Sequence, residues 1–120
     1  MVWAVEKAQG LIDNGGFAYF FENDWPENPP YSIFVTAFRE IGAIEAADYL
    51  QRAIEDFPFA NPHLDYKKRR DHLENSRSSA DEDDSVIDNL GDYVMNLSND
   101  TYVKLEEYIR KNSHSFPHHA

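Results

Sequence analysis

Apolar residues recur along most of the chain at the three- and four-residue spacing of amphipathic helices. A first helix is predicted from the positions Val2, Val5, Ala8 and Ile12. Residues 13–16 (DNGG) predict its end, because glycine readily adopts the positive φ of a helix terminus. The aromatic run at residues 17–21 (FAYFF) predicts a short buried helix, and the Asn- and Pro-rich residues 23–30 predict a loop.

The middle of the chain carries two further periodic segments. A helix ending near Gly42 is predicted from Tyr31, Phe34, Phe38 and Ile41. Pro58 closes the next helix, because the residue before a proline disfavours helical geometry. The apolar positions of that helix are Ile44, Ala47, Leu50, Ile54 and Phe57. A charged helix is predicted over residues 63–75, and residues 76–85 are expected to form a surface connector.

Two helices are predicted in the C-terminal part of the chain. The first is defined by Val86, Leu90, Tyr93 and Leu97, and the second by Tyr102, Leu105 and Ile109. No segment shows the sustained apolar–polar alternation of strands. The pattern therefore predicts an all-α fold, a single compact and irregular bundle of about six helices over residues 1–112, with a flexible tail at 113–120.

The composition excludes several classes of function. The 120 residues include 11 Lys and Arg against 22 Asp and Glu, giving a net charge of −11, and such a field repels nucleic acid and anionic lipid. Cysteine is absent, which excludes disulfides, thiol nucleophiles and thiolate metal sites. No stretch approaches the roughly 20 apolar residues of a membrane span, so a cytoplasmic protein is expected.

Acidic residues follow one side of the predicted helix that starts near Val86. At about 100° per residue, Asp84, Asp88 and Asp92 fall near 0°, 40° and 80°, whereas the apolar positions fall at roughly 180–240°. One interpretation is a solvated face with favourable charge at a helix N-terminus. The other is a docking surface for a basic partner, shaped to imitate a nucleic-acid backbone. The candidate partner-binding residues are Asp81, Glu82, Asp83, Asp84, Asp88 and Asp92.

Metal, cofactor and catalytic sites find little support. A calcium loop starting at Asp81 fails, because Val86 replaces the required glycine and Asp92 the bidentate glutamate. His63 and His72 lack a metal-binding spacing, and residues 118–119 (HH) lie in the predicted tail. We therefore expect no metal and no cofactor. The remaining enzymatic route is a carboxylate pair in a cleft.

Two other segments admit a structural or a functional interpretation. The basic residues 67–70 (KKRR) point all round a helix and can pair with neighbouring acids, so a solvated, partly neutralised helix is expected. The aromatic residues of the run 17–21 are expected to anchor the core. Trp25, beside Pro26, is a candidate for lining an exposed groove together with Tyr31.

The string at residues 14–23 (NGGFAYFFEN) resembles a known family. Together with residues 41–43 (IGA) and 46–53 (AADYLQRA), it is similar to a bacterial domain whose best-studied relatives are called DNA-mimic proteins of the DMP type. The resemblance covers about residues 1–112. It implies an all-α monomer or dimer without enzymatic activity, and in the named relative an acidic surface that engages a DNA-binding regulator. The structural signature comprises Asn14, Gly15, Gly16, Phe17, Tyr19, Phe20 and Phe21.

The sequence thus predicts a non-enzymatic domain that binds a basic protein through residues 81–92 and competes with DNA for a DNA-binding regulator. One alternative is an immunity- or antitoxin-like inhibitor that covers the basic active site of a nuclease. Another is a small hydrolytic enzyme with a carboxylate cleft near Trp25 and Tyr31. Direct binding to nucleic acid or to a membrane is not expected.

Overall fold

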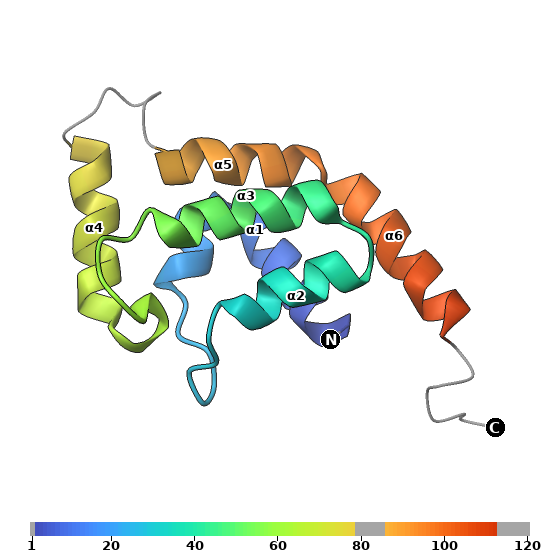
Figure 1. The fold of residues 1–120 in the computed structure, drawn as a ribbon. Helices are drawn as coiled ribbons and strands as arrows, with labels where there is room; N and C mark the ends of the chain where they lie inside the picture. Colours follow the sequence, from blue (N-terminus) through green and yellow to red (C-terminus); the bar gives the residue numbers. More distant parts are fainter. Residues whose placement is uncertain (1, 79–85, 113–120) are drawn as a thin grey trace.

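The computed structural model describes residues 2–78 and 86–112, and these residues form six α-helices and one short 3-10 helix (Figure 1). No strand occurs among them, and the predicted all-α class is confirmed. The elements are α1 (Val2–Glu22), α2 (Ser32–Glu40), α3 (Ile44–Glu55), η1 (Pro62–Leu64), α4 (Tyr66–Ser78), α5 (Val86–Asn96) and α6 (Ser98–Lys111).

Helix α1 is interrupted at the glycine pair, as the sequence predicts. Gly16 has φ 68° and ψ −166°, a combination that is essentially restricted to glycine. At Gly15 an added Cβ would lie 2.5 Å from Cβ of Tyr19, so a side chain has no room there. The Asn14 side-chain Nδ2 donates to the carbonyl of Gly10 at 2.9 Å and stabilises the last turn before the break. The helix then resumes in a new direction.

The second half of α1 delivers three phenylalanines into the core. Phe17, Phe20 and Phe21 are fully buried and pack edge to face, with ring centroids 5.1 Å apart for Phe20 and Phe21. Tyr19 is 49% exposed, so the prediction that it belongs to the core was wrong. Residues 17, 20 and 21 share one face of a helix by their spacing of three and four, and Tyr19 lies on the other face.

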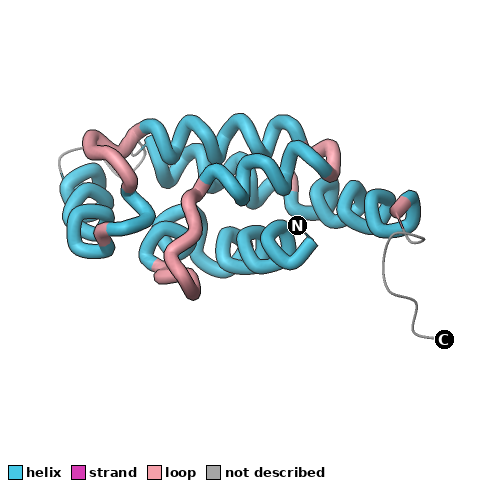
Figure 2. Tube along the Cα trace, turned by 60° about the horizontal axis from the view of Figure 1, so that its bottom comes forward, coloured by secondary structure: helices cyan, strands magenta, loops and turns pink. Residues whose placement is uncertain are grey.

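Helix α1 lies at the centre of the fold and contacts α2, α4, α5 and α6. Figures 1 and 2 show α3 and α5 side by side and antiparallel, α4 standing across one end, and α6 extending from the other. All four predicted apolar positions of α2 are buried. Three buried alanines on α3 let the neighbouring helices approach closely: Ala46, Ala47 and Ala53.

Helix α6 is less deeply packed than its sequence pattern predicts. Leu105 is buried together with Thr101, but Tyr102 and Ile109 are exposed, so their assignment to the core was wrong. The helix projects beyond the end of α5 (Figure 1) and contacts α1 and α5. The predicted connector at 76–85 also begins too early, because α4 continues to Ser78; the remainder lies outside the described residues.

Helix α4 is fastened by a buried arginine. Arg69 is 1% exposed: its Nε donates to the carbonyl of Phe21 and its Nη1 to that of Pro62, both at 2.8 Å. Its Nη2 donates to Asp24 Oδ1 at 2.7 Å. The prediction of a solvated, partly neutralised helix was therefore wrong at Arg69, whereas Lys67, Lys68 and Arg70 are exposed as predicted. The guanidinium fork saturates acceptors in three separate segments, which explains its burial.

None of the helices in residues 2–78 and 86–112 has the length and apolar character needed to span a bilayer.

Candidate docking surface

The orientation of α5 is set by its packing against α1. Ile87, Leu90 and Val94 are buried, and Gly91 between them approaches the backbone of Phe17 so closely that a Cβ there would lie 2.7 Å from the Phe17 nitrogen. The predicted core positions Val86 and Tyr93 are instead 51% and 52% exposed, so that part of the prediction was wrong. Gly91 lets α5 lie close against α1, and Val86 and Tyr93 point away from the core.

The two described acidic residues of the predicted patch lie on the unburied side of this helix. Asp92 is exposed and Asp88 is partly exposed. Within the described part of the chain, the Asp92 carboxylate has no hydrogen-bond or ion-pair partner. Residues 81–84, which supply the other four acids of the predicted patch, lie outside the described residues. In the described residues, the candidate surface therefore consists of the exposed carboxylate of Asp92 and the partly exposed one of Asp88, which lies one helical turn earlier.

An aromatic pair that the sequence reasoning missed borders these carboxylates. The ring of Tyr93 on α5 stacks on that of Tyr49 on α3, with centroids 5.2 Å apart and an angle of 27° between the planes. The guanidinium carbon of Arg52 lies 5.8 Å from the centroid of the Tyr49 ring. The sequence feature that could have pointed to this pair is the position of Tyr93 at the edge of the apolar arc of α5, next to Asp92.

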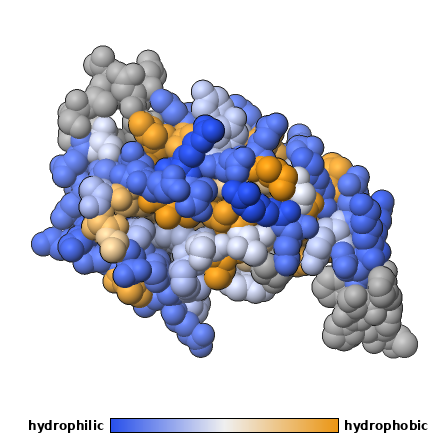
Figure 3. Space-filling view, in the orientation of Figure 1, coloured by the Kyte–Doolittle hydropathy of each residue, from blue (hydrophilic) through white to orange (hydrophobic). Residues whose placement is uncertain are grey.

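Helix α3 carries further exposed carboxylates. Glu45, Asp48 and Glu55 are all exposed. Asp48 binds Arg39 of α2 at 2.8 Å in an exposed ion pair, which contributes little to stability but occupies one cation. The face that α2 and α3 present in Figure 3 is mostly hydrophilic, with small separate hydrophobic areas. The acidic character of the surface is therefore spread over two neighbouring helices.

A further acidic position connects α1 with α6. Asp13 accepts hydrogen bonds from Gln9 Nε2 at 2.9 Å and from Ser98 Oγ at 2.7 Å. Partial burial raises the pKa of the Tyr102 hydroxyl, and the nearby carboxylates of Asp13 and Glu6 add to that effect. The hydrogen bond from Ser98 to Asp13 joins the start of α6 to α1, so Asp13 has a structural role.

The predicted groove at Trp25 and Tyr31 is absent, because both side chains are buried in the aromatic core. The Trp25 and Phe34 ring centroids are 4.6 Å apart, and the Tyr31 ring packs edge-on against Phe21 at 5.2 Å. The neighbouring carboxylate of Asp24 is occupied by Arg69. The hydrolytic alternative therefore has no cleft at this position, and that expectation was wrong.

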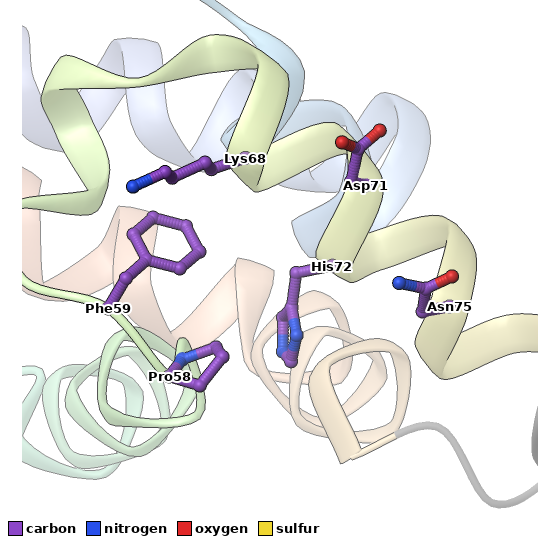
Figure 4. Close-up of a pocket in the computed structure, with 6 residues that line it drawn as sticks. All are labelled: Pro58, Phe59, Lys68, Asp71, His72 and Asn75. Carbon is purple, nitrogen blue, oxygen red and sulfur yellow. The ribbon is translucent and has the colours of Figure 1, made fainter.

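One shallow pocket, of about 210 Å³, lies between α4 and the loop after α3. Figure 4 shows Lys68 extending over the Phe59 ring and His72 pointing toward Pro58; Asp71 and Asn75 of α4 complete the lining. Lys68 Nζ lies 5.7 Å from the Phe59 ring centroid, and His72 Nε2 is 3.0 Å from Asp56 Oδ2. The volume is below the roughly 300 Å³ of a typical ligand pocket, and its lining contains no Ser, Thr or Cys.

The two described histidines, His63 and His72, have different neighbours. His63 packs edge-on against Tyr31, with ring centroids 6.1 Å apart, whereas His72 lies beside Asp56. Among residues 2–78 and 86–112, no group of three or more His, Asp or Glu residues is placed to hold a metal ion. The predicted positions 118–119 lie outside the described residues.

The sequence, including the string at residues 14–23, matches the model of a known family over residues 1–112. The chain belongs to the DMP19-like protein family. No curated protein and no solved structure matches it. In this DMP19-like protein, Gly15 and Gly16 create the break in α1. Three residues that follow the break fill the core: Phe17, Phe20 and Phe21. These five residues of the string at 14–23 therefore have a structural role.

Proposed function

We propose that this DMP19-like protein is a non-enzymatic DNA mimic that occupies the DNA-binding surface of a basic protein. The observation that carries the proposal is the outward position of Asp88 and Asp92 on α5 in a member of this family with a net charge of −11. The four acids of residues 81–84 precede this helix in the sequence and extend the same charged segment.

The physical basis of the proposal is charge complementarity. Between Arg77 and Lys104 the sequence contains no Lys or Arg, so α5 and the segment before it contribute only negatively charged side chains. A protein that binds DNA through Lys and Arg meets in this segment an array of anions, which attracts it over a distance of about a Debye length. Binding then displaces DNA by competition, without any chemical step.

An affinity experiment with host-cell lysate tests the proposal. Immobilised protein is loaded at low salt and eluted with a salt gradient, and the eluted proteins are identified. We expect a DNA-binding protein that duplex DNA displaces from the column. A recovered nuclease whose activity is inhibited would instead support the immunity-type alternative.

Two double variants separate this patch from net charge. Asp88→Asn/Asp92→Asn removes two negative charges from α5, and Glu27→Gln/Glu107→Gln removes two from exposed positions elsewhere. The first variant should release the partner at lower salt, and the second should behave like the wild type. If both variants shift the elution equally, the surface acts as solubilising charge and the proposal fails.

A further inference from the structure

The stacked tyrosines on the seam between α3 and α5 are the most unusual part of the acidic surface. Tyr93 is 52% exposed, yet its ring is held in place by Tyr49. The exposed Tyr19 and Tyr102 have no aromatic partner in the described part of the chain. An aromatic ring that is exposed and already ordered loses little conformational entropy on binding, which is why tyrosines frequently anchor protein interfaces.

The stack already attracts a guanidinium group. Arg52 lies one turn after Tyr49 on α3, with its guanidinium carbon 5.8 Å from the Tyr49 ring centroid. Cations over an aromatic face are attracted by its quadrupole, and guanidinium groups combine this attraction with planar stacking. The half-exposed ring of Tyr93 is open to the same kind of contact with a group from another molecule.

Each of the two tyrosines has an exposed carboxylate near it along its own helix. Asp92 precedes Tyr93 on α5, and Glu45 lies one turn before Tyr49 on α3; both are exposed. A guanidinium over the Tyr93 ring can bind a carboxylate with its remaining N–H groups, whereas an ammonium group is a compact, strongly hydrated charge that stacks poorly. The chemistry of the site therefore favours arginine over lysine.

We propose that the Tyr49–Tyr93 stack is the anchor of the docking surface and takes an arginine side chain of the basic partner, with Asp92 as its counter-ion. This inference rests on the proposed function, because it assumes a basic protein partner. It adds that recognition depends on arginine and on an aromatic ring as well as on net charge. DNA-binding proteins use arginine widely to contact phosphates, so the required side chain is available on such a partner.

Two peptides of equal length and charge serve as probes, one with eight arginines and one with eight lysines, each separated by glycines. Their affinities are measured by fluorescence anisotropy at low salt. We expect the wild-type protein to bind the arginine peptide roughly two- to fivefold more tightly, corresponding to one exposed cation–π contact. Amide shifts in the nuclear magnetic resonance spectrum should concentrate at Tyr49 and Tyr93.

Variants distinguish the anchor from the electrostatic field. Tyr93→Leu should abolish the preference for arginine, whereas Tyr93→Phe and the matched exposed control Tyr102→Leu should retain it. Circular dichroism verifies that each variant is folded. Asp88→Asn/Asp92→Asn should weaken the binding of both peptides.

Each remaining outcome has a defined meaning. Equal affinity of the wild type for the two peptides, or an arginine preference that survives in Tyr93→Leu, overturns the anchor. If both peptides bind equally and the Asp variant weakens both, the proposed function stands without the anchor. If neither peptide binds, or if the Asp variant binds both as tightly as the wild type, the proposed function fails and the anchor fails with it.

Discussion

Gly91 of α5 lies directly against the backbone of Phe17 in α1. A Cβ at position 91 would come within 2.7 Å of the Phe17 nitrogen and 3.2 Å of the Phe17 Cβ. This contact joins the proposed docking helix to the segment that follows the break in α1. It also turns Asp92 and Tyr93 outward, because the glycine side of α5 must face α1.

Gly91→Ala should destabilise the protein by roughly 1–3 kcal/mol, since the added methyl group meets backbone that cannot move independently. Urea denaturation followed by circular dichroism measures the change in the free energy of unfolding. Gly10→Ala is the matched control, because a Cβ at Gly10 meets no atom within 4 Å. The control should gain about 0.5–1 kcal/mol from helix propensity. Equal effects of the two substitutions would contradict the close packing at Gly91.

Gly16→Ala tests the break in α1. At φ 68° and ψ −166° an alanine is strained by about 1–3 kcal/mol, although nothing obstructs its Cβ. The free energy of unfolding should fall by that amount, while the same change at Gly10 should not reduce it. An unchanged stability of Gly16→Ala would mean that the chain does not need this conformation.

Arg69→Met tests the attachment of α4. The substitution removes the donors to the carbonyls of Phe21 and Pro62, and each buried acceptor left without a donor costs roughly 1–3 kcal/mol. Hydrogen exchange should accelerate in α4 before the rest of the protein. Asp24→Asn should cost less than about 1 kcal/mol, because the Asp24 side chain is 61% exposed. A stable Arg69→Met variant with protected α4 amides would refute the fastening role.

Much of this fold could be predicted from hydrophobic spacing. The four apolar positions predicted for α2 are buried, and Gly16 and Gly42 of the predicted terminating signals have positive φ. Hydrophobic spacing gave a wrong prediction where a contact depends on the shape of the residue. It placed Tyr93 in the core and did not identify the contact at Gly91, because a pattern of apolar residues does not include glycine. It likewise read Arg69 as solvated, since its acceptors come from segments 7, 45 and 48 residues away.

The candidate site was predictable only in part. The exposure of Asp92 follows from helical periodicity, because it lies opposite the apolar arc of α5. The Tyr49–Tyr93 stack could not be found in this way, since it depends on the pairing of α3 with α5. Trp25 and Tyr31 were assigned to a groove because proline-rich neighbours suggested a surface loop, whereas both rings turn inward to the phenylalanines.

The raised pKa of the buried Tyr31 hydroxyl predicts a loss of stability at alkaline pH. Burial raises the pKa of this hydroxyl from 10.0 to about 12; nearby Arg69 opposes the shift and Asp24 adds to it. As the pH rises, the unfolded chain therefore releases this proton before the folded protein does. The contribution of the protonated Tyr31 hydroxyl to the free energy of unfolding is complete below pH 10 and is lost as the pH rises towards 12. The loss should reach about 2 kcal/mol at pH 12.

Denaturation of the wild type and Tyr31→Phe between pH 8 and pH 12 isolates this contribution, because the other titrating groups are common to both proteins. The difference in the free energy of unfolding should change with pH only above pH 10. A difference that stays constant over the whole range would contradict the buried, protonated hydroxyl.

Competition with DNA tests the central claim most directly. A DNA-binding protein recovered from the lysate is bound to its labelled duplex, and the DMP19-like protein is added while the mobility of the duplex is followed in a gel. We expect release of free duplex when the concentration of the DMP19-like protein approaches the dissociation constant of its complex with the DNA-binding protein. The Asp88→Asn/Asp92→Asn variant should require a higher concentration. A ternary complex of DNA and both proteins, or release that the double variant achieves as well as the wild type, would contradict mimicry through α5.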